Sequence, residues 1–305
     1  MRVLVTGGAG FIGSHVVKAC LQAGHEVAVV DDLSHGRREN VPPGIPLYTV
    51  DIRTPALAEA FDAFCPEVVS HHAAQVSVAY AVAHPAEDTA INVTGTVNVL
   101  AQAVRLGVRK VIFASSVAVY GNPQAQPCDE THPIAPLSPY GLAKATGEAY
   151  IRLFARLYDL PFTIFRYGNV YGPRQSVVGE AGVVAIFTHR MLQGEPTTID
   201  GDGLQTRDFV YVEDIARANV LALTRGAGET LNLGTGHATT VQALWHELRR
   251  LTGYPGEPSY GPPRPGDIRA MVLDARRAAE VLGWQPQVTL QEGLQRTVAA
   301  FRARG

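Results

Sequence analysis

Short apolar runs alternate with longer segments of helical spacing through the first half of the chain. The runs lie at residues 3–5, 26–30, 47–50, 68–71, 111–115 and 162–166. Between them, apolar residues recur three or four positions apart, most clearly over 11–17, 54–64 and 85–104. Strands that alternate with amphipathic helices are typical of a parallel sheet covered on both faces. We therefore predict an α/β fold with a doubly wound parallel sheet.

The pattern changes after residue 167, where bends rich in glycine and proline separate the periodic segments. Further helices are expected near 183–192, 214–223, 240–251, 275–282 and 290–301. We predict a first domain over 1–167, to which part of 207–235 returns. A smaller mixed α/β domain is expected over 168–305.

A glycine-rich turn joins the first strand to the first helix. Gly7, Gly10 and Gly13 lie three residues apart, which suits a tight turn, a close approach of the backbone to a pyrophosphate and close packing of helix on strand. The second strand ends at Asp31, whose carboxylate can accept hydrogen bonds from a ribose and would repel a 2′-phosphate. Together these features predict a Rossmann domain that binds NAD. The two arginines at 37–38 are the one feature that would suit NADP instead.

The ends of the next two strands also carry candidate cofactor contacts. Asp51 follows the third strand, and Ala73 and Ala74 follow the fourth. Ligands of an open parallel sheet lie at the carboxyl ends of its strands, so we expect Asp51 near the adenine and the alanines beside a flat ring. His71 and His72 are adjacent, and adjacent side chains on a strand point to opposite faces. We therefore expect no metal site.

Composition narrows the possible partners. The 305 residues include 26 basic and 28 acidic ones, which gives a net charge of −2 and a pI of about 6.6. A net charge so close to zero provides no strong electrostatic attraction for nucleic acid or an anionic membrane. The three cysteines lie far apart without a metal-binding pattern, as expected of reduced thiols. We expect a cytoplasmic protein, because no basic leader precedes the first strand and no apolar run approaches the ~20 residues of a membrane span.

The strongest chemical signal lies at 138–144. Ser138 and Pro139 are favourable residues for the N-cap and the first turn of a helix. Tyr140 and Lys144 then lie one turn apart on the same face. A phenol has a pKa of about 10, and an ammonium about 4 Å away would lower it by roughly three units. Tyr140 is thus a candidate acid and base, and Lys144 a candidate for tuning it.

In this order the motifs resemble the extended branch of the short-chain dehydrogenase/reductase family, and within it the nucleotide-sugar epimerases, over nearly the full length of the chain. The resemblance implies that Tyr140 is the acid and base, that Ser116 hydrogen-bonds the sugar hydroxyl, and that Lys144 binds the nicotinamide ribose. It also implies an NAD site formed by Gly7, Gly10, Phe11, Ile12, Gly13, Asp31, Asp32, Leu33, Asp51, Ile52, Ala73, Ala74, Asn92, Ser115, Tyr167 and Val170.

Substrate contacts are expected mainly from the second half of the chain. The resemblance assigns them to Gln75, Asn169, Arg207, Arg264 and Asp267. Guanidinium groups can hold a diphosphate through paired hydrogen bonds. Taken alone, each arginine is equally well explained as part of a surface ion pair, so this assignment depends on the resemblance.

The resemblance implies NAD-dependent epimerisation at C4 of a nucleotide sugar through a transient 4-keto sugar, with UDP-glucose and UDP-galactose as the expected pair. The rival within the family is a nucleotide-sugar dehydratase or decarboxylase. Related dehydratases carry an acid pair directly after the hydroxyl residue of the fifth strand. Here Ser116 is followed by apolar residues 117–119, and Asp129 and Glu130 lie beyond a proline-bearing loop. The rival of another class, a non-catalytic NAD-sensing regulator, is disfavoured by the intact catalytic set.

Several residues depart from the epimerase pattern, so the pattern does not determine which sugar the substrate carries. Val76 stands where many of these enzymes carry a lysine, and Gly168 and Val170 replace residues of the best-known members. Met271 lies where the family sets the width of the sugar pocket, and its bulk disfavours an N-acetyl group. The choice among UDP, dTDP and GDP also stays open. By analogy with this fold, we expect a homodimer.

Overall fold

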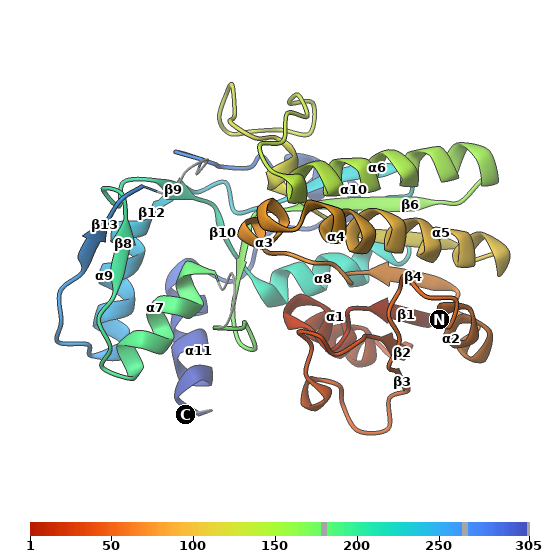
Figure 1. Cartoon of the computed structure of the whole chain (residues 1–305), viewed down its shortest axis with the longest axis horizontal. Helices are drawn as coiled ribbons and strands as arrows, with labels where there is room; N and C mark the ends of the chain where they lie inside the picture. The colour runs from red at the N-terminus through yellow and green to blue at the C-terminus, as the bar shows by residue number, and fades with distance from the viewer. Residues whose placement is uncertain (178–181, 264–267, 304–305) are drawn as a thin grey trace.

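The computed structural model describes residues 1–177, 182–263 and 268–303. Within these residues, a seven-stranded sheet has the order β11-β6-β5-β4-β1-β2-β3, and its neighbouring strands are parallel (Figure 1). The strands are β1 (Arg2–Thr6), β2 (Glu26–Val30), β3 (Leu47–Tyr48), β4 (Val68–His71), β5 (Lys110–Ser116), β6 (Phe162–Tyr167) and β11 (Glu229–Leu233). The chain winds in opposite directions from β1, so the crevice for a ligand lies beyond the carboxyl ends of β1 and β4. The predicted doubly wound parallel sheet is confirmed.

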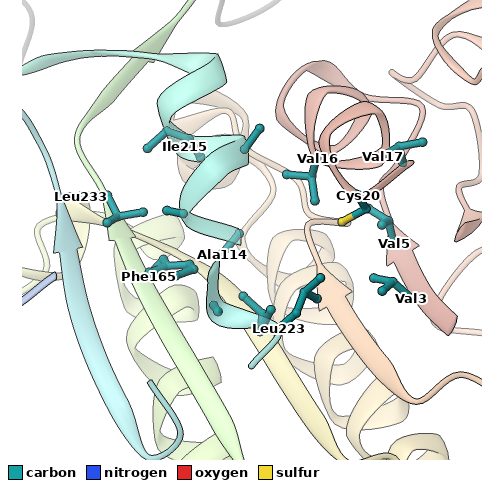
Figure 2. Packing of buried hydrophobic residues seen from close by; sticks show 14 of the residues in the cluster. Val3, Val5, Val16, Val17, Cys20, Ala114, Phe165, Ile215, Leu223 and Leu233 are labelled. Carbon is teal, nitrogen blue, oxygen red and sulfur yellow. The ribbon is translucent and has the colours of Figure 1, made fainter. Parts of the chain in front are cut away.

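Helices cover both faces of this sheet (Figure 1). One face carries α1 (Phe11–Gln22), α8 (Val212–Ala222) and α10 (Arg276–Leu282), and the other carries α2 (Leu57–Phe64), α5 (Gly95–Arg105) and α6 (Pro139–Tyr158). Figure 2 shows the first face, where Val16 and Cys20 of α1 and Ile215 of α8 belong to one buried cluster with Phe165 of β6. Burial on both faces explains why the strands are apolar runs instead of alternating patterns.

A long helical stretch precedes β5. It consists of α3 (Val78–Ala83), α4 (Pro85–Thr89), a π-helical turn (Ala90–Thr94) and α5. The helix expected over 85–104 is therefore present, but it contains a wider turn that apolar spacing does not reveal. In the described part of the chain, no helix combines the length and the apolar content needed to cross a membrane.

Two early boundaries differ from the prediction. β3 ends at Tyr48, so the apolar run 47–50 is only partly a strand. α2 begins at Leu57 because Thr54 first forms a turn with Asp51, in which its hydroxyl and its backbone N–H both donate to the carbonyl oxygen of Asp51.

The remaining elements form a smaller mixed unit beside the main sheet (Figure 1). Its helices α7 (Val183–Leu192), α9 (Val241–Thr252) and α11 (Leu290–Arg302) pack around a core that includes Trp245. Short strands pair as β7 with β10, β8 with β13 and β9 with β12; they are β7 (Asn169–Tyr171), β8 (Thr198–Asp200), β9 (Thr206–Arg207), β10 (Phe209–Tyr211), β12 (Thr239–Thr240) and β13 (Ser259–Gly261). Between these segments the chain returns to the main sheet through α8 and β11. A domain boundary at residue 167 stays a prediction.

Candidate active site

A large cavity opens at the carboxyl ends of the sheet strands. Its volume is about 1620 Å³, which exceeds the roughly 300–1,000 Å³ of pockets that hold one drug-sized ligand. The cavity therefore has room for two ligands. Its lining includes the glycine turn, the ends of β2, β4, β5 and β6, the loop after β3, α6 and the segment after β7. The cavity also extends to the ends of α7, α9 and α11.

Most of the predicted site residues border this one cavity. They are Gly7, Gly10, Phe11, Ile12, Gly13, Asp31, Asp32, Asp51, Ile52, Ala73, Ala74, Gln75, Ser115, Ser116, Tyr140, Lys144, Tyr167, Asn169 and Val170. Leu33, Asn92 and Arg207 do not border it. Arg264 and Asp267 lie outside the described residues.

The glycine turn is shaped by contacts that leave no room for side chains. Gly7 has a left-handed φ of 69°, and a Cβ on it would lie 2.6 Å from the backbone nitrogen of Ala73. A Cβ on Gly13 would lie 2.1 Å from the carbonyl oxygen of Gly7. Gly10 is the N-cap of α1, and the first turn of this helix holds no acidic residue. The N-terminus of α1 therefore presents its partial positive charge to the cavity, as a pyrophosphate requires.

Asp31 ties the loop after β2 to the glycine turn. Its carboxylate accepts hydrogen bonds from the backbone nitrogens of Ala9 and Leu33, both at 2.9 Å. Burial raises the pKa of this carboxyl, while the two backbone hydrogen bonds favour its charged form. Leu33 has a left-handed φ of 60° and packs against the hydrophobic core. Leu33 does not border the cavity, because its side chain turns to the core and its backbone supports Asp31; its expected contact with the cofactor stays a prediction.

The start of α6 has the predicted geometry. The hydroxyl of Ser138 caps the helix by accepting a hydrogen bond from the backbone nitrogen of Gly141 at 3.1 Å, and Pro139 is the first helical residue. Tyr140 and Lys144 follow one turn apart, and both border the cavity. The capping prediction is confirmed.

Lys144 is buried between α6 and β5. Its ammonium donates a hydrogen bond of 2.8 Å to the carbonyl oxygen of Ala114 and lies 6.0 Å from the centre of the Tyr140 ring. Burial lowers the pKa of Lys144 to about 8, and the charge of Asp88 acts in the opposite direction. Ser116, two residues after Ala114, ends β5 at the same cavity. The arrangement gathers a hydroxyl, a phenol and a buried ammonium, which is a set suited to moving one proton.

Asn92 lies behind the cavity wall. Its side-chain oxygen accepts a hydrogen bond from the backbone nitrogen of Gln75, and its side-chain nitrogen donates to the carbonyl oxygen of Gln75, both at 2.9 Å. Asn92 does not itself border the cavity, and its expected contact with the cofactor stays a prediction. Asn92 instead fixes the backbone of a residue that does border the cavity, because its helical position turns it towards the loop after β4.

Two further residues lie away from the cavity. Arg207 is in β9, and its guanidinium donates to the carbonyl oxygen of Thr206 at 2.8 Å. β9 belongs to the small sheet with β12, and Arg207 does not border the cavity, so its expected contact with the substrate stays a prediction. Met271 is 1% exposed and packs with Val119 and Tyr120, so it does not border the cavity either.

The two adjacent histidines point to different surroundings, as expected. His71 contacts the hydroxyls of Thr6 and Thr96 at 2.6 and 3.0 Å, whereas His72 contacts Ser70 and stacks on Tyr167. Burial lowers the pKa of both histidines to about 3, so both are neutral. The described residues contain no cluster of three or more potential metal ligands.

A buried ion pair beneath the site was missed by sequence reasoning. Arg166 of β6 makes two hydrogen bonds with Glu148 of α6, at 2.7 and 2.9 Å, and the hydroxyl of Ser115 donates to Glu148 at 2.6 Å. Both charged side chains are almost fully buried. The available signals were an arginine inside an apolar run and a glutamate one helical turn beyond Lys144.

Comparison with known proteins agrees with this geometry. Residues 3–234 match the family described as the NAD-dependent epimerase/dehydratase family. The chain is 48% identical to the UDP-glucose 4-epimerase of Mycolicibacterium smegmatis, with 99% of each chain covered.

Solved structures give the same result. The UDP-glucose 4-epimerase of Thermotoga maritima, crystallised with UDP-glucose, superposes with a TM-score of 0.98 at 49% identity and covers 100% of this chain and 99% of its own. The Thermus thermophilus UDP-glucose 4-epimerase in complex with NAD has a TM-score of 0.96 at 45% identity, with both chains covered completely. The chain therefore belongs to the NAD-dependent epimerase/dehydratase family.

Proposed function

We propose that this protein interconverts UDP-glucose and UDP-galactose by inverting the configuration at C4. The observation that carries the proposal is the convergence of Ser116, Tyr140 and Lys144 on one cavity that is also bordered by the glycine turn. When bound, NAD accepts the hydride from C4 and returns it to the other face of the sugar. Similarity over the full chain to two UDP-glucose 4-epimerases, one with NAD and one with UDP-glucose, supports the choice of reaction and ligands.

The chain fits NAD at the glycine turn. A Cβ at Gly7 or Gly13 would collide with backbone, so these positions keep the turn flat enough for a pyrophosphate to reach the N-terminus of α1. Asp31 borders the cavity, and two backbone hydrogen bonds favour its charged form. A carboxylate there can accept hydrogen bonds from a ribose and would repel a 2′-phosphate.

Tyr140 takes the proton from the 4-hydroxyl group and later returns it. An ammonium at about 6 Å stabilises a phenolate by on the order of 3 kcal/mol at an effective dielectric of about 20, which corresponds to about two pKa units. Lys144 supplies this charge to the Tyr140 phenol. The hydroxyl of Ser116 holds the sugar oxygen in line for the transfer.

The 4-keto sugar must turn over before it is reduced again. The cavity volume of about 1620 Å³ supports this step, because a tightly filled pocket would prevent rotation. Asn169 and Gln75 border the same cavity, where Asn169 is the candidate contact for the nucleotide diphosphate and Gln75 a candidate contact for the substrate.

Elimination or decarboxylation receives no comparable support. Glu130 accepts a hydrogen bond from the backbone nitrogen of Asn232 at 2.7 Å, away from the cavity lining, and Val117 and Val119 are buried. Neither acid of the pair 129–130 borders the cavity. The acid pair at 129–130 therefore lies away from the place where it could remove water from C5 and C6.

A substrate panel tests the proposal. Purified protein is incubated with UDP-, dTDP- and GDP-linked glucose and galactose and with UDP-N-acetylglucosamine, and the products are separated by chromatography. We expect conversion of UDP-glucose and UDP-galactose in both directions. Exclusive turnover of an N-acetylated or non-uridine substrate would overturn the substrate assignment.

We also propose that two copies of the chain pair through α6. Leu142, Leu153 and Leu157 are exposed on this helix and recur at multiples of a turn, so they share one face. Burial of this apolar stripe is the expected gain from pairing. Light scattering should give a dimer mass for the wild type and a monomer mass for Leu157→Glu. A monomeric wild type would contradict the proposal.

A reducing cytoplasmic location is proposed on the chemistry of the cysteines. Cys20 and Cys128 are buried, and burial raises the pKa of each thiol to about 12. Cys65 is exposed and is not part of a disulfide. Such a set suits a compartment that keeps thiols reduced. Recovery of the protein from a secreted fraction would contradict this.

A further inference from the structure

His71 is a buried histidine to which the reaction described above gives no role. It is the last residue of β4, is 2% exposed, and directly precedes residues 72–75, which border the cavity. Its Nδ1 lies 2.6 Å from the hydroxyl oxygen of Thr6 on β1, and its Nε2 lies 3.0 Å from the hydroxyl oxygen of Thr96 on α5. The imidazole therefore bridges the strand that leads into the glycine turn and a helix on one face of the sheet.

Backbone groups fix the direction of the hydrogen bonds at both ends of this bridge. At one end, the backbone nitrogen of Ala73 donates to the hydroxyl oxygen of Thr6 at 3.2 Å. At the other end, the hydroxyl of Thr96 donates to the carbonyl oxygen of Asn92 at 2.7 Å. A hydroxyl has a single hydrogen to donate. Because the hydrogen of Thr96 goes to Asn92, the Nε2 of His71 must be the donor to Thr96.

The tautomer of His71 follows from these directions. Burial above all, and then the charge of Lys144, lowers the pKa of His71 to about 3, so the ring is neutral. In a neutral ring with a hydrogen on Nε2, the Nδ1 nitrogen can only accept. It therefore takes the hydrogen of the Thr6 hydroxyl. The result is one chain of hydrogen bonds that runs in a single direction, from the N–H of Ala73 to the carbonyl of Asn92.

This chain holds the loop after β4 in place. Asn92 belongs to the π-helical turn, and its side chain also bonds to the backbone nitrogen and carbonyl oxygen of Gln75. One turn thus holds the loop at Ala73 and at Gln75. The backbone nitrogen of Ala73 lies against the glycine turn, where a Cβ on Gly7 would be only 2.6 Å from it. A shift of Ala73 therefore changes the gap between this loop and the glycine turn.

We propose that His71, with its ring hydrogen on Nε2, is a positioning residue for the NAD site, because it sets the loop 73–75 against the glycine turn. The inference deepens the NAD site proposed above and rests on it. The two segments meet across 67 residues of chain, from Thr6 to Ala73. Fixing their separation before the cofactor arrives lowers the cost of ordering the site on binding.

The tautomer can be read in the wild-type, NAD-loaded protein. Histidine labelled with ¹⁵N distinguishes ring nitrogens that carry a hydrogen from those that do not. The signals of His71 are identified by contact with the ring of Phe113, whose centre lies 5.7 Å away. We expect a hydrogen on Nε2 and none on Nδ1 at pH 7. A hydrogen on Nδ1 would overturn the inference, and this measurement needs no variant.

Thr96→Val removes the acceptor of the Nε2 hydrogen with little change in volume. An N–H that faces a methyl group is unpaired, so the ring hydrogen should move to Nδ1 and compete with Ala73 for the oxygen of Thr6. We expect bound NAD to exchange with ¹⁴C-labelled NAD about tenfold faster, the scale of one lost hydrogen bond. Thr96→Ser keeps the hydroxyl and should restore both the tautomer and the exchange rate.

Thr297→Val is the matched control. Thr297 is buried in α11, and its hydroxyl donates at 2.7 Å to the carbonyl oxygen of Gly293, four residues earlier, as the hydroxyl of Thr96 does to Asn92. Both valine variants should lower the urea midpoint of unfolding by similar amounts. Only Thr96→Val should change the tautomer of His71 and the exchange of NAD.

Two results would separate this inference from the site on which it rests. An NAD exchange rate in Thr96→Val equal to that in Thr297→Val would overturn the inference alone and show that the chain only stabilises the fold. A wild-type protein that binds no NAD would overturn the proposed cofactor site as well. If Thr96→Val does not fold, Thr96→Ala removes the same hydroxyl with a smaller side chain, and the same faster exchange is required.

Discussion

The ammonium of Lys144 donates to the carbonyl oxygen of Ala114 across 2.8 Å, which ties the start of α6 to the end of β5. This hydrogen bond sets the distance between the helix that carries Tyr140 and the strand that ends in Ser116. Because Lys144 also lies 6.0 Å from the centre of the Tyr140 ring, one side chain both orients and polarises the proposed base.

Replacing the phenol tests the base. Tyr140→Phe keeps the ring and removes the ionisable oxygen, so kcat should fall by about 10² or more, the usual scale for loss of a positioned general base. Steady-state assays with UDP-galactose measure this, and NAD content measured after denaturation serves as the control for an intact site. Activity close to that of the wild type would assign proton transfer to another group.

Replacing Lys144 tests whether its charge lowers the pKa of Tyr140. In Lys144→Ala the phenol of Tyr140 loses its cationic neighbour, so its pKa should rise and the acid limb of the kcat profile should move to higher pH. In the wild type, burial lowers the pKa of Lys144 to about 8. Lys144 therefore carries its positive charge below that pH and loses the charge above it. A profile of kcat from pH 5 to 10 decides the point, and an acid limb that stays in place would contradict the role of Lys144.

The choice of cofactor depends on Asp31. Asp31→Ala removes the charge that would repel a 2′-phosphate, so the affinity for NAD should fall relative to that for NADP. Calorimetric titration of the cofactor-free protein measures both affinities. Asp62→Asn provides a matched control, because it makes a similar loss of charge at an exposed carboxylate that pairs with Arg105 and does not border the cavity. An unchanged ratio of the two affinities in Asp31→Ala would contradict the assignment.

The buried pair of Glu148 and Arg166 makes a prediction about stability. Glu148→Gln leaves the Arg166 charge without its partner, so the free energy of unfolding at pH 7 should fall by roughly 3–5 kcal/mol. Burial acts to raise the pKa of Glu148, but the hydrogen bond and charge of Arg166 outweigh it and hold that pKa below its ordinary value. The stabilisation is therefore present above the unfolded-state pKa of about 4.3 and is lost as the pH falls through the lower folded-state value.

Urea unfolding at pH 7 and in acid measures this effect. The difference between the wild type and Glu148→Gln should shrink in acid, where the wild-type carboxyl is also neutral. Glu292→Gln is the control, because Glu292 forms an exposed ion pair with Arg296 one turn away and should change stability by less than about 1 kcal/mol. A loss in Glu148→Gln as small as in this control would contradict the prediction.

Local sequence predicts those parts of the site that depend on backbone conformation, namely the glycine turn and the helix cap. Gly7 and Gly13 are required by positive φ or close packing, and Ser138 is a helix cap, so their neighbours along the chain reveal their roles. α7 occupies the residues 183–192 that apolar spacing predicts. The order of these motifs indicates the family, and the family match confirms it.

The rest depends on contacts between segments far apart in the chain. The resemblance predicts Asn92 at the cofactor, whereas the hydrogen bonds of its side chain with the backbone of Gln75 cannot be read from the residues around it. Arg207 carries the right charge, yet the pairing of β9 with β12 sets it away from the cavity. The buried charge of Arg166 in β6 is explained only by Glu148 on α6, which spacing along the sequence does not reveal.

The fate of the hydrogen at C4 tests the proposed reaction most directly. UDP-galactose is incubated with the purified protein in D₂O, and the product is examined by proton NMR. The account predicts UDP-glucose that retains the original hydrogen at C4 and carries no deuterium at C5 or C6. Deuterium at C5 or C6 with accumulation of a 4-keto-6-deoxy sugar would contradict it and show that the enzyme is a dehydratase.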